Sequence, residues 1–223
     1  MKRTLNKSSF SLLEKVFEKF VFHFILKVRG GFVVKHLYFM RHGQTLFNVY
    51  RRIQGWCDSP LTEVGINQAI EARKYLKNIP FDHYYSSTSE RACDTLELVT
   101  EGKVSYTRLK GLKERYFGVF EGQSEDLLPS TKYFDTIFPI YGGESHEVLG
   151  NRMLTTLTEM MEKENHHIVL VVSHCGAGYD FLRKVEKEYH KVHFSNGDTL
   201  HFTYENGEFD YVEILKLEEK DYG

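Results

Sequence analysis

The chain has 223 residues, with 29 Lys and Arg against 31 Asp and Glu, 14% aromatic residues and only 4 Pro. This composition excludes a disordered chain, and the net charge of −2 excludes the cationic surface that drives nonspecific nucleic-acid binding. The length suits one domain with an appendage. Three widely spaced cysteines, Cys57, Cys93 and Cys175, fit neither a disulfide framework nor a CxxC metal site, so we expect a reducing, cytoplasmic environment.

Residues 1–33 form an extension ahead of the regular pattern. Apolar side chains recur at helical spacing over residues 11–28, which predicts an amphipathic helix that either docks on the domain or lies on a membrane surface. Its most apolar run is too short for a spanning helix, so no stable membrane insertion is expected. Arg29-Gly30-Gly31 allows another interpretation, because a purine-rich ribosome-binding sequence translates to such residues. Val33 or Val34 would then be the true start of the protein.

From residue 34 to residue 223 the predicted elements alternate between strands and helices in one domain. In chain order we predict a strand at 33–40, a helix at 62–78, a strand at 82–86, a helix at 87–100, a helix at 144–163, a strand at 168–172, a further helix, and a hairpin of strands 199–204 and 209–215. Ser87 and Glu90 form a capping-box pattern, and residues 124–143 lack clear periodicity. This order predicts an α/β fold, a three-layer sandwich with a mainly parallel central sheet flanked by helices and a C-terminal hairpin.

Three predicted strand ends carry arginine or histidine. Arg41 and His42 follow the first strand, Arg91 follows the second, and His174 follows the uniformly apolar strand. Because ligands of open α/β sheets bind outside the carboxyl ends of the strands, we expect these side chains to lie together. Two guanidinium groups match phosphate oxygens in pairs, and the helix that begins near Ser87 adds its dipole. The pattern therefore indicates a site for a dense anion such as phosphate.

The strand ends also carry a set of motifs in a fixed order. They are Arg41-His-Gly-Gln-Thr45 with Asn48 and Gln54-Gly55, Asp58-Ser-Pro-Leu-Thr-Glu-Val-Gly65, Ser86-Ser-Thr-Ser-Glu-Arg-Ala92, Glu114-Arg-Tyr-Phe-Gly118, Gly142-Gly-Glu-Ser145 and Val172-Ser-His174. Over about residues 35–215 the chain thereby resembles the histidine phosphatase superfamily, which includes the cofactor-dependent phosphoglycerate mutases. The resemblance implies that His42 is a nucleophile that forms a phosphohistidine and that Glu114 is the general acid. The substrate-binding residues that it implies are Arg41, Asn48, Gln54, Gly55, Arg91 and His174. It implies no metal and no cofactor.

The branch of the family depends on the segment that follows Glu114. Mutases of this family place a lysine shortly after the Glu-Arg-x-Tyr-Gly turn, whereas Glu125 stands at that position here and Lys132 is the only basic residue between Tyr116 and Gly143. We therefore expect a phosphatase that acts on small phosphorylated metabolites. A phosphoglycerate mutase and a non-catalytic module that binds a phosphorylated ligand are the alternatives. The sequence leaves the oligomeric state open, a homodimer included.

Overall fold

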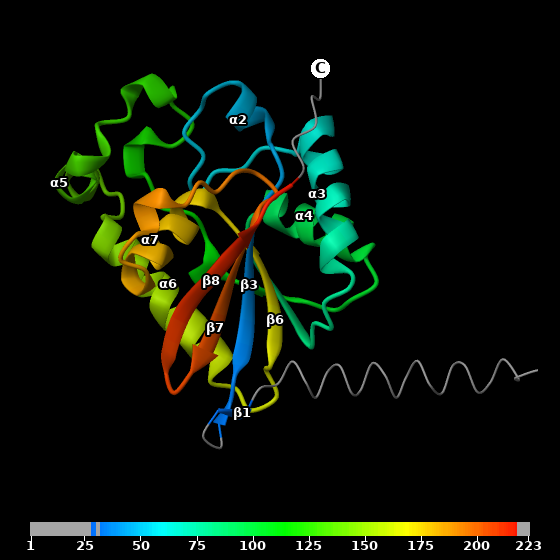
Figure 1. Ribbon diagram of the computed structural model, residues 1–223. Helices are drawn as coiled ribbons and strands as arrows, with labels where there is room; N and C mark the ends of the chain where they lie inside the picture. Colours follow the sequence, from blue (N-terminus) through cyan, green and yellow to red (C-terminus); the bar gives the residue numbers. More distant parts are fainter. Residues whose placement is uncertain (1–27, 30–31, 218–223) are drawn as a thin grey trace, which may run out of the picture.

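The computed structural model describes residues 28–29 and 32–217, and its centre is a six-stranded sheet in the order β5-β4-β6-β3-β7-β8 (Figure 1). The strands of the sheet are β3 (Lys35–Arg41), β4 (His83–Ser87), β5 (Thr107–Leu109), β6 (Ile168–Ser173), β7 (Thr199–Glu205) and β8 (Glu208–Leu215). The first four run parallel to one another, and β7 and β8 are antiparallel to their neighbours. The predicted α/β fold with a mainly parallel sheet and a C-terminal hairpin is confirmed.

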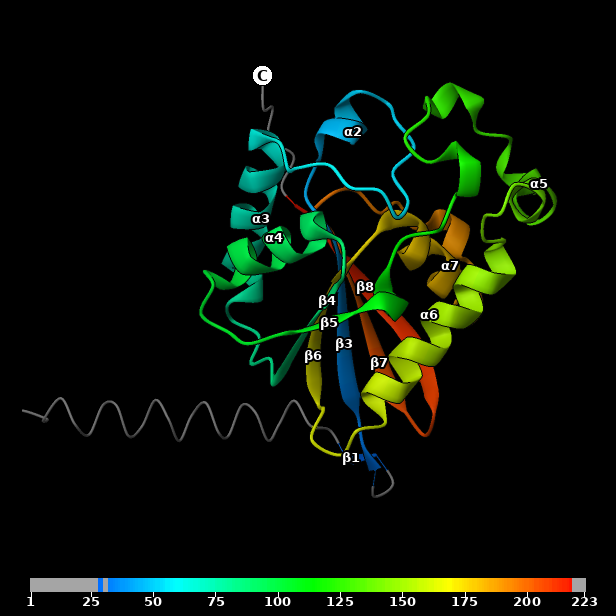
Figure 2. The same cartoon turned by 180° about the vertical axis from the view of Figure 1, so that it is seen from behind.

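Helices cover both faces of this sheet. They are α2 (Leu46–Val49), α3 (Glu63–Leu76), α4 (Glu90–Thr100), α5 (Phe134–Ile140), α6 (His146–Met161) and α7 (Cys175–Val185). Short 3-10 turns lie at η1 (Lys110–Leu112), η2 (Gly118–Phe120), η3 (Glu125–Leu127), η4 (Thr131–Tyr133) and η5 (Tyr189–Lys191). In Figures 1 and 2 the pair α3 and α4 lies on one side of the sheet, and α6 and α7 lie on the other. The sandwich therefore has three layers.

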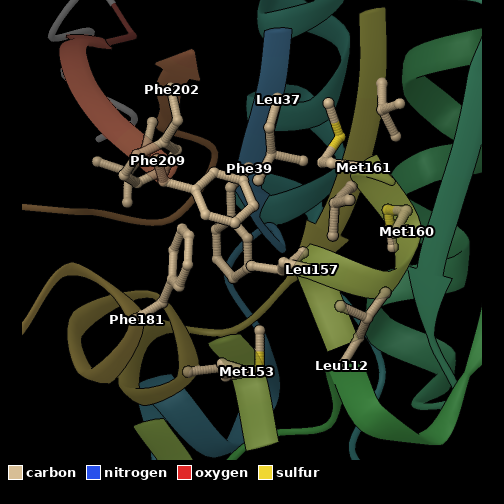
Figure 3. Packing of buried hydrophobic residues seen from close by; sticks show 14 of the residues in the cluster. Leu37, Phe39, Leu112, Met153, Leu157, Met160, Met161, Phe181, Phe202 and Phe209 are labelled. Carbon is tan, nitrogen blue, oxygen red and sulfur yellow. The ribbon is translucent and has the colours of Figure 1, made fainter. Parts of the chain in front are cut away.

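Alternation along the strands divides the core in two. Phe39 faces the α6 and α7 layer, where Figure 3 shows it beside Leu157 and Phe181. Its neighbour Met40 belongs to the second cluster, which includes Ala69 of α3. All of these side chains are fully buried. Because successive residues of a strand point to opposite faces, a continuous apolar run fits a strand that is covered on both sides.

The start of α4 differs from the prediction. Ser87 is the last residue of β4, and its hydroxyl lies 2.8 Å from Nε2 of His174. The N-cap residue is Ser89, which makes no side-chain capping hydrogen bond. The backbone N–H of Glu90 instead donates to the carboxylate of Asp58, at 2.6 Å. The predicted Ser87 capping box is therefore wrong, because the cap comes from a residue distant in the sequence.

The segment without clear periodicity contains short helical turns. Residues 124–143 include η3, η4 and α5, and α5 has only seven residues. Phe138 is fully buried and packs against the rings of Phe117 and Phe120. A helix of two turns is too short to reveal a period of 3.6 residues, so the sequence pattern did not predict it.

The predicted helix at 11–28 lies outside the described residues except for its last position. There, β1 (Val28–Arg29) pairs with β2 (Phe32–Val33) in a two-stranded hairpin. Across the described residues 28–29 and 32–217, we find no helix long and apolar enough to cross a membrane. The C-terminal hairpin is as predicted, and its turn residues Asn206 and Gly207 both have positive φ, of 54° and 88°. That geometry suits a tight two-residue turn.

Candidate active site

The carboxyl ends of the parallel strands open into a cavity of about 680 Å³. It lies at the end of the sheet that carries α2 in Figure 1. Its lining includes Arg41, His42 and Glu114 from the predicted site. Among the described residues, no group of three or more His, Cys, Asp and Glu side chains is placed to hold a metal ion. The cavity lining thus combines cations and imidazoles with two buried carboxylates, Glu114 and Asp180.

His42 is buried in the loop that follows β3. Its Nδ1 lies 2.7 Å from the Gly43 carbonyl oxygen, which can only accept, so Nδ1 carries a proton. The other ring nitrogen, Nε2, lies 3.2 Å from Nε of Arg91. Burial, followed by the charges of Arg91 and Arg41, lowers the pKa of His42 well below 6.5. The ring is thus neutral near pH 7, and the lone pair on Nε2 accepts a hydrogen bond from Nε of Arg91.

Arg91 is fully buried, and its guanidinium binds more of the protein than the sequence implied. Its Nε donates to His42. Its Nη1 donates to the Cys57 carbonyl at 3.0 Å and to the Asp58 carboxylate at 2.8 Å. Nη2 donates to the Gly55 carbonyl at 2.9 Å. The residue therefore fixes the loop that contains the Gln54-Gly55 motif as well as facing the nucleophile. The role of Asp58 was missed, because its partner is 33 positions away in the chain.

Two buried nitrogens near His42 lack hydrogen-bond partners within the described part of the chain. They are Nε of Arg41 and Nδ1 of His174. Nε2 of His174 lies 2.8 Å from the Ser87 hydroxyl; when this hydroxyl donates to Nε2 instead of to the Ser89 hydroxyl, at 3.4 Å, the ring proton is on Nδ1. Burial, Arg91 and His42 lower the pKa of His174 well below 6.5. Unsatisfied buried donors are rare in folded proteins, so these two groups favour an anionic ligand beside His42.

Glu114 is 7% exposed, and its carboxylate lies at the N-terminus of α7. Oε1 accepts from the backbone N–H groups of Ala177, at 2.9 Å, and Arg115, at 2.7 Å. Among the described residues, Oε2 accepts a hydrogen bond from the N–H of Gly176 alone, at 2.8 Å. Because a carboxylate oxygen has two lone pairs, Oε2 is the position at which this group has room for a proton.

The remaining predicted ligands lie on the loops around the cavity. Asn48 and Gln54 line it, and both use their side-chain oxygens to bind Thr45. The Asn48 amide nitrogen has no hydrogen bond to the described residues and is free to donate. Gly55 does not line the cavity; its carbonyl binds Arg91, and a Cβ at this position would collide with the Glu121 carboxylate. Gly55 therefore shapes the loop.

The lining of the cavity also contains residues that the sequence did not predict. Arg183 of α7 and Arg52 of the loop after α2 join Lys132 there. Lys132 is the only basic residue between Tyr116 and Gly143, and the further cations come from outside that segment. A signal was present in the spacing, since Cys175, Tyr179 and Arg183 occur every four residues on one face of α7 and all line the cavity.

This fold and site define an α/β protein with two buried histidines and two arginines at the strand ends of a parallel sheet. The chain belongs to the histidine phosphatase superfamily (branch 1), whose family model matches residues 37–215. It is 33% identical to "Probable phosphoglycerate mutase GpmB" of Proteus mirabilis over 147 residues, which cover 62% of this chain and 68% of that protein.

Solved structures of mutases and phosphatases resemble the chain equally well. The phosphoglycerate mutase from Bacillus anthracis str. Sterne has a TM-score of 0.72 and 28% identity, covering 80% of this chain and 92% of that one. A mutant phosphoserine phosphatase from Entamoeba histolytica, in complex with phosphoserine, has a TM-score of 0.70 and 27% identity. The match covers 80% of this chain and 95% of that one. Both mutases and phosphatases therefore occur among the proteins that this chain resembles.

Proposed function

We propose that the protein hydrolyses phosphomonoesters of small metabolites through a phosphohistidine on His42. The observation that carries this proposal is the neutral His42 ring in the cavity lining, next to Arg41 and His174, which both have unsatisfied buried nitrogens. A phosphate dianion repels most nucleophiles, so its hydrolysis requires fixed positive groups and a nucleophile that is uncharged. The cavity lining supplies both.

In the first step His42 Nε2 gives up the hydrogen bond from Arg91 and its lone pair attacks phosphorus, while the bond between phosphorus and the ester oxygen breaks. The electron pair goes to the leaving oxygen, which takes a proton from Glu114. In the second step a water oxygen attacks phosphorus, the P–N bond breaks, and its electron pair returns to Nε2. Glu114 accepts the proton of this water. Arg41 and Arg91 neutralise the phosphoryl oxygens in both steps, and the neutral His174 ring donates a hydrogen bond to them.

The Glu114→Gln variant tests the first step, because the need for a proton depends on the leaving group. A glycerol phosphate must release a strongly basic alkoxide, whereas p-nitrophenyl phosphate releases a stabilised phenolate. We expect the variant to lose about 10² to 10⁴-fold more activity on the alkyl ester than on the aryl ester. Single-turnover rates for both proteins and both esters measure this ratio. Equal losses would mean that the proton comes from another group.

A phosphoglycerate mutase is the second candidate, and a specific observation favours it. Arg52, Lys132 and Arg183 line the cavity and are able to bind a second anionic group of a substrate. Incubation of the enzyme with 3-phosphoglycerate separates the two reactions, because a mutase forms 2-phosphoglycerate and a phosphatase forms inorganic phosphate. We expect inorganic phosphate. Binding of a phosphorylated ligand without turnover of any ester would instead indicate a non-catalytic binding module.

A further inference from the structure

Two contacts join the Glu114-Arg115 pair to α7. The Glu114 carboxylate accepts from the first N–H groups of the helix, at Gly176 and Ala177. One turn further along, Asp180 forms an ion pair with the Arg115 guanidinium, and both side chains are almost completely buried. The peptide that carries the proposed acid is therefore attached to α7 by both of its side chains.

Asp180 and Arg115 are themselves held by neighbouring elements. Nδ1 of His146, at the start of α6, lies 2.7 Å from Oδ1 of Asp180. Arg115 donates from Nη1 to the Glu144 carbonyl, at 2.8 Å. Its guanidinium also lies over the ring of Phe134, 5.3 Å from the centroid. The ion pair is thus fixed from α5, α6 and α7 at once.

A buried ion pair is weak evidence for a stabilising role. Desolvation of the two charges offsets much of their attraction, and apolar side chains of similar size often serve stability as well. The position of the Arg115–Asp180 pair, one residue and one helical turn from the Glu114 contacts, suits a role in orientation. A displacement of about 1 Å at a reacting group is able to lower a rate by about 10²-fold.

We infer that Asp180 is a positioning residue for Glu114. By binding Arg115, it holds the N-terminus of α7 against the Glu114 carboxylate. Oε1 then accepts backbone N–H groups, and Oε2 faces the leaving group. This inference rests on the proposed role of Glu114 as the general acid. Its consequence is selective, because loss of the Arg115–Asp180 contact should impair only those esters whose leaving group needs a proton.

The test compares Asp180→Asn with Glu125→Gln in the full chain. Both variants remove one negative charge from the cavity wall without changing side-chain size, but Glu125 contacts Arg51 instead of Arg115. For Asp180→Asn we expect the single-turnover rate on glycerol phosphate to fall by about 10 to 100-fold. The rate on p-nitrophenyl phosphate should stay within about threefold. KM for both esters should change little, and Glu125→Gln should affect both esters equally.

The outcomes separate this inference from the proposed function. Equal losses on the two esters in Asp180→Asn, or no loss on either, would overturn the positioning role. If Glu114→Gln shows no preference between the esters, the acid role fails, whatever Asp180 does. Should Asp180→Asn melt below the assay temperature, His146→Gln decides in its place, because it removes a support of Asp180 from a less buried position. The same preference between esters is then required.

Discussion

His42 is surrounded by groups that oppose its protonation. The lowered pKa of this ring comes first from burial and then from the nearby Arg91 and Arg41 cations. A histidine with its ordinary pKa of about 6.5 would lose its lone pair as the pH falls through that value. His42 therefore remains a nucleophile under conditions in which an exposed histidine is protonated.

The pH dependence of aryl ester hydrolysis measures this property. We expect kcat for p-nitrophenyl phosphate at saturating substrate to stay constant between about pH 7 and pH 6, because neither His42 nor the leaving group then needs a change of protonation. A profile of kcat against pH is the measurement. A decline centred near pH 6.5 would show that the nucleophile titrates normally.

Arg91 is a second residue whose role depends on its particular side chain, the planar guanidinium group. It donates to His42, Gly55, Cys57 and Asp58 from a single planar group. A lysine has one point charge and no planar arrangement of donors, so Arg91→Lys should lower kcat/KM by about 10²-fold or more. Arg108→Lys is the matched control, since Arg108 is half exposed and pairs with Glu90. A mild loss for Arg91→Lys would limit Arg91 to holding the loop.

At the scale of elements, the loop after β3 packs directly on the first turn of α3. Gly43 and Gly65 face each other across this contact, and a Cβ at Gly65 would lie 2.8 Å from the Gln44 backbone nitrogen. That neighbour is main chain and has no flexible end that is able to move aside. The same loop carries His42, so its position depends on the absence of side chains at both glycines.

Gly65→Ala tests this packing. We expect it to lower the free energy of unfolding by about 1–3 kcal/mol, as overpacking does, and to reduce turnover because the His42 loop must shift. Asn67→Ala on the exposed face of α3 is the control and should change neither quantity appreciably. Thermal melting and the rate on p-nitrophenyl phosphate measure the two effects. An unchanged melting temperature for Gly65→Ala would contradict the close contact.

Elements that are determined by residues close together in the sequence were predictable. The uniformly apolar strand β6 and the Asn206-Gly207 turn have patterns that depend on near neighbours alone. Contacts between distant residues were not. Asp58 caps α4 at Glu90, which is 32 positions further along the chain. Arg115 pairs with Asp180, which is 65 positions further along. Local patterns contain no information on such pairs, so the ion pairs behind the site became visible only in the fold.

At the scale of the whole molecule, a buried histidine, His166, and a partly exposed one, His83, lie near the other end of the sheet. His83 at the start of β4 stacks on His166, with ring centroids 3.6 Å apart. Nε2 of His166 also lies 2.6 Å from the Tyr85 hydroxyl. Burial, followed by the charge of His83, lowers the pKa of His166 to about 4. The native state therefore keeps this ring neutral far below the pH at which the unfolded chain binds a proton.

This difference predicts a loss of stability in acid. Above about pH 6.5 neither state protonates His166, so its contribution is fully present. As the pH falls from about 6.5 toward 4, only the unfolded state gains the proton, and the free energy of unfolding decreases. Melting temperatures measured across this range should fall, and less steeply in His166→Gln than in the natural chain. Exposed His190→Gln is the control and should leave the slope unchanged. Equal slopes for the two variants would contradict this assignment.

The most direct test of the central claim is to identify the residue that carries the phosphoryl group during turnover. The enzyme is mixed with p-nitrophenyl phosphate, quenched rapidly in base, digested and analysed by mass spectrometry. We expect the mass of one phosphoryl group on His42, attached at Nε2, and none in the His42→Ala variant, which should also lose turnover while remaining folded. Phosphate on another residue, or full activity in His42→Ala, would contradict the proposed mechanism.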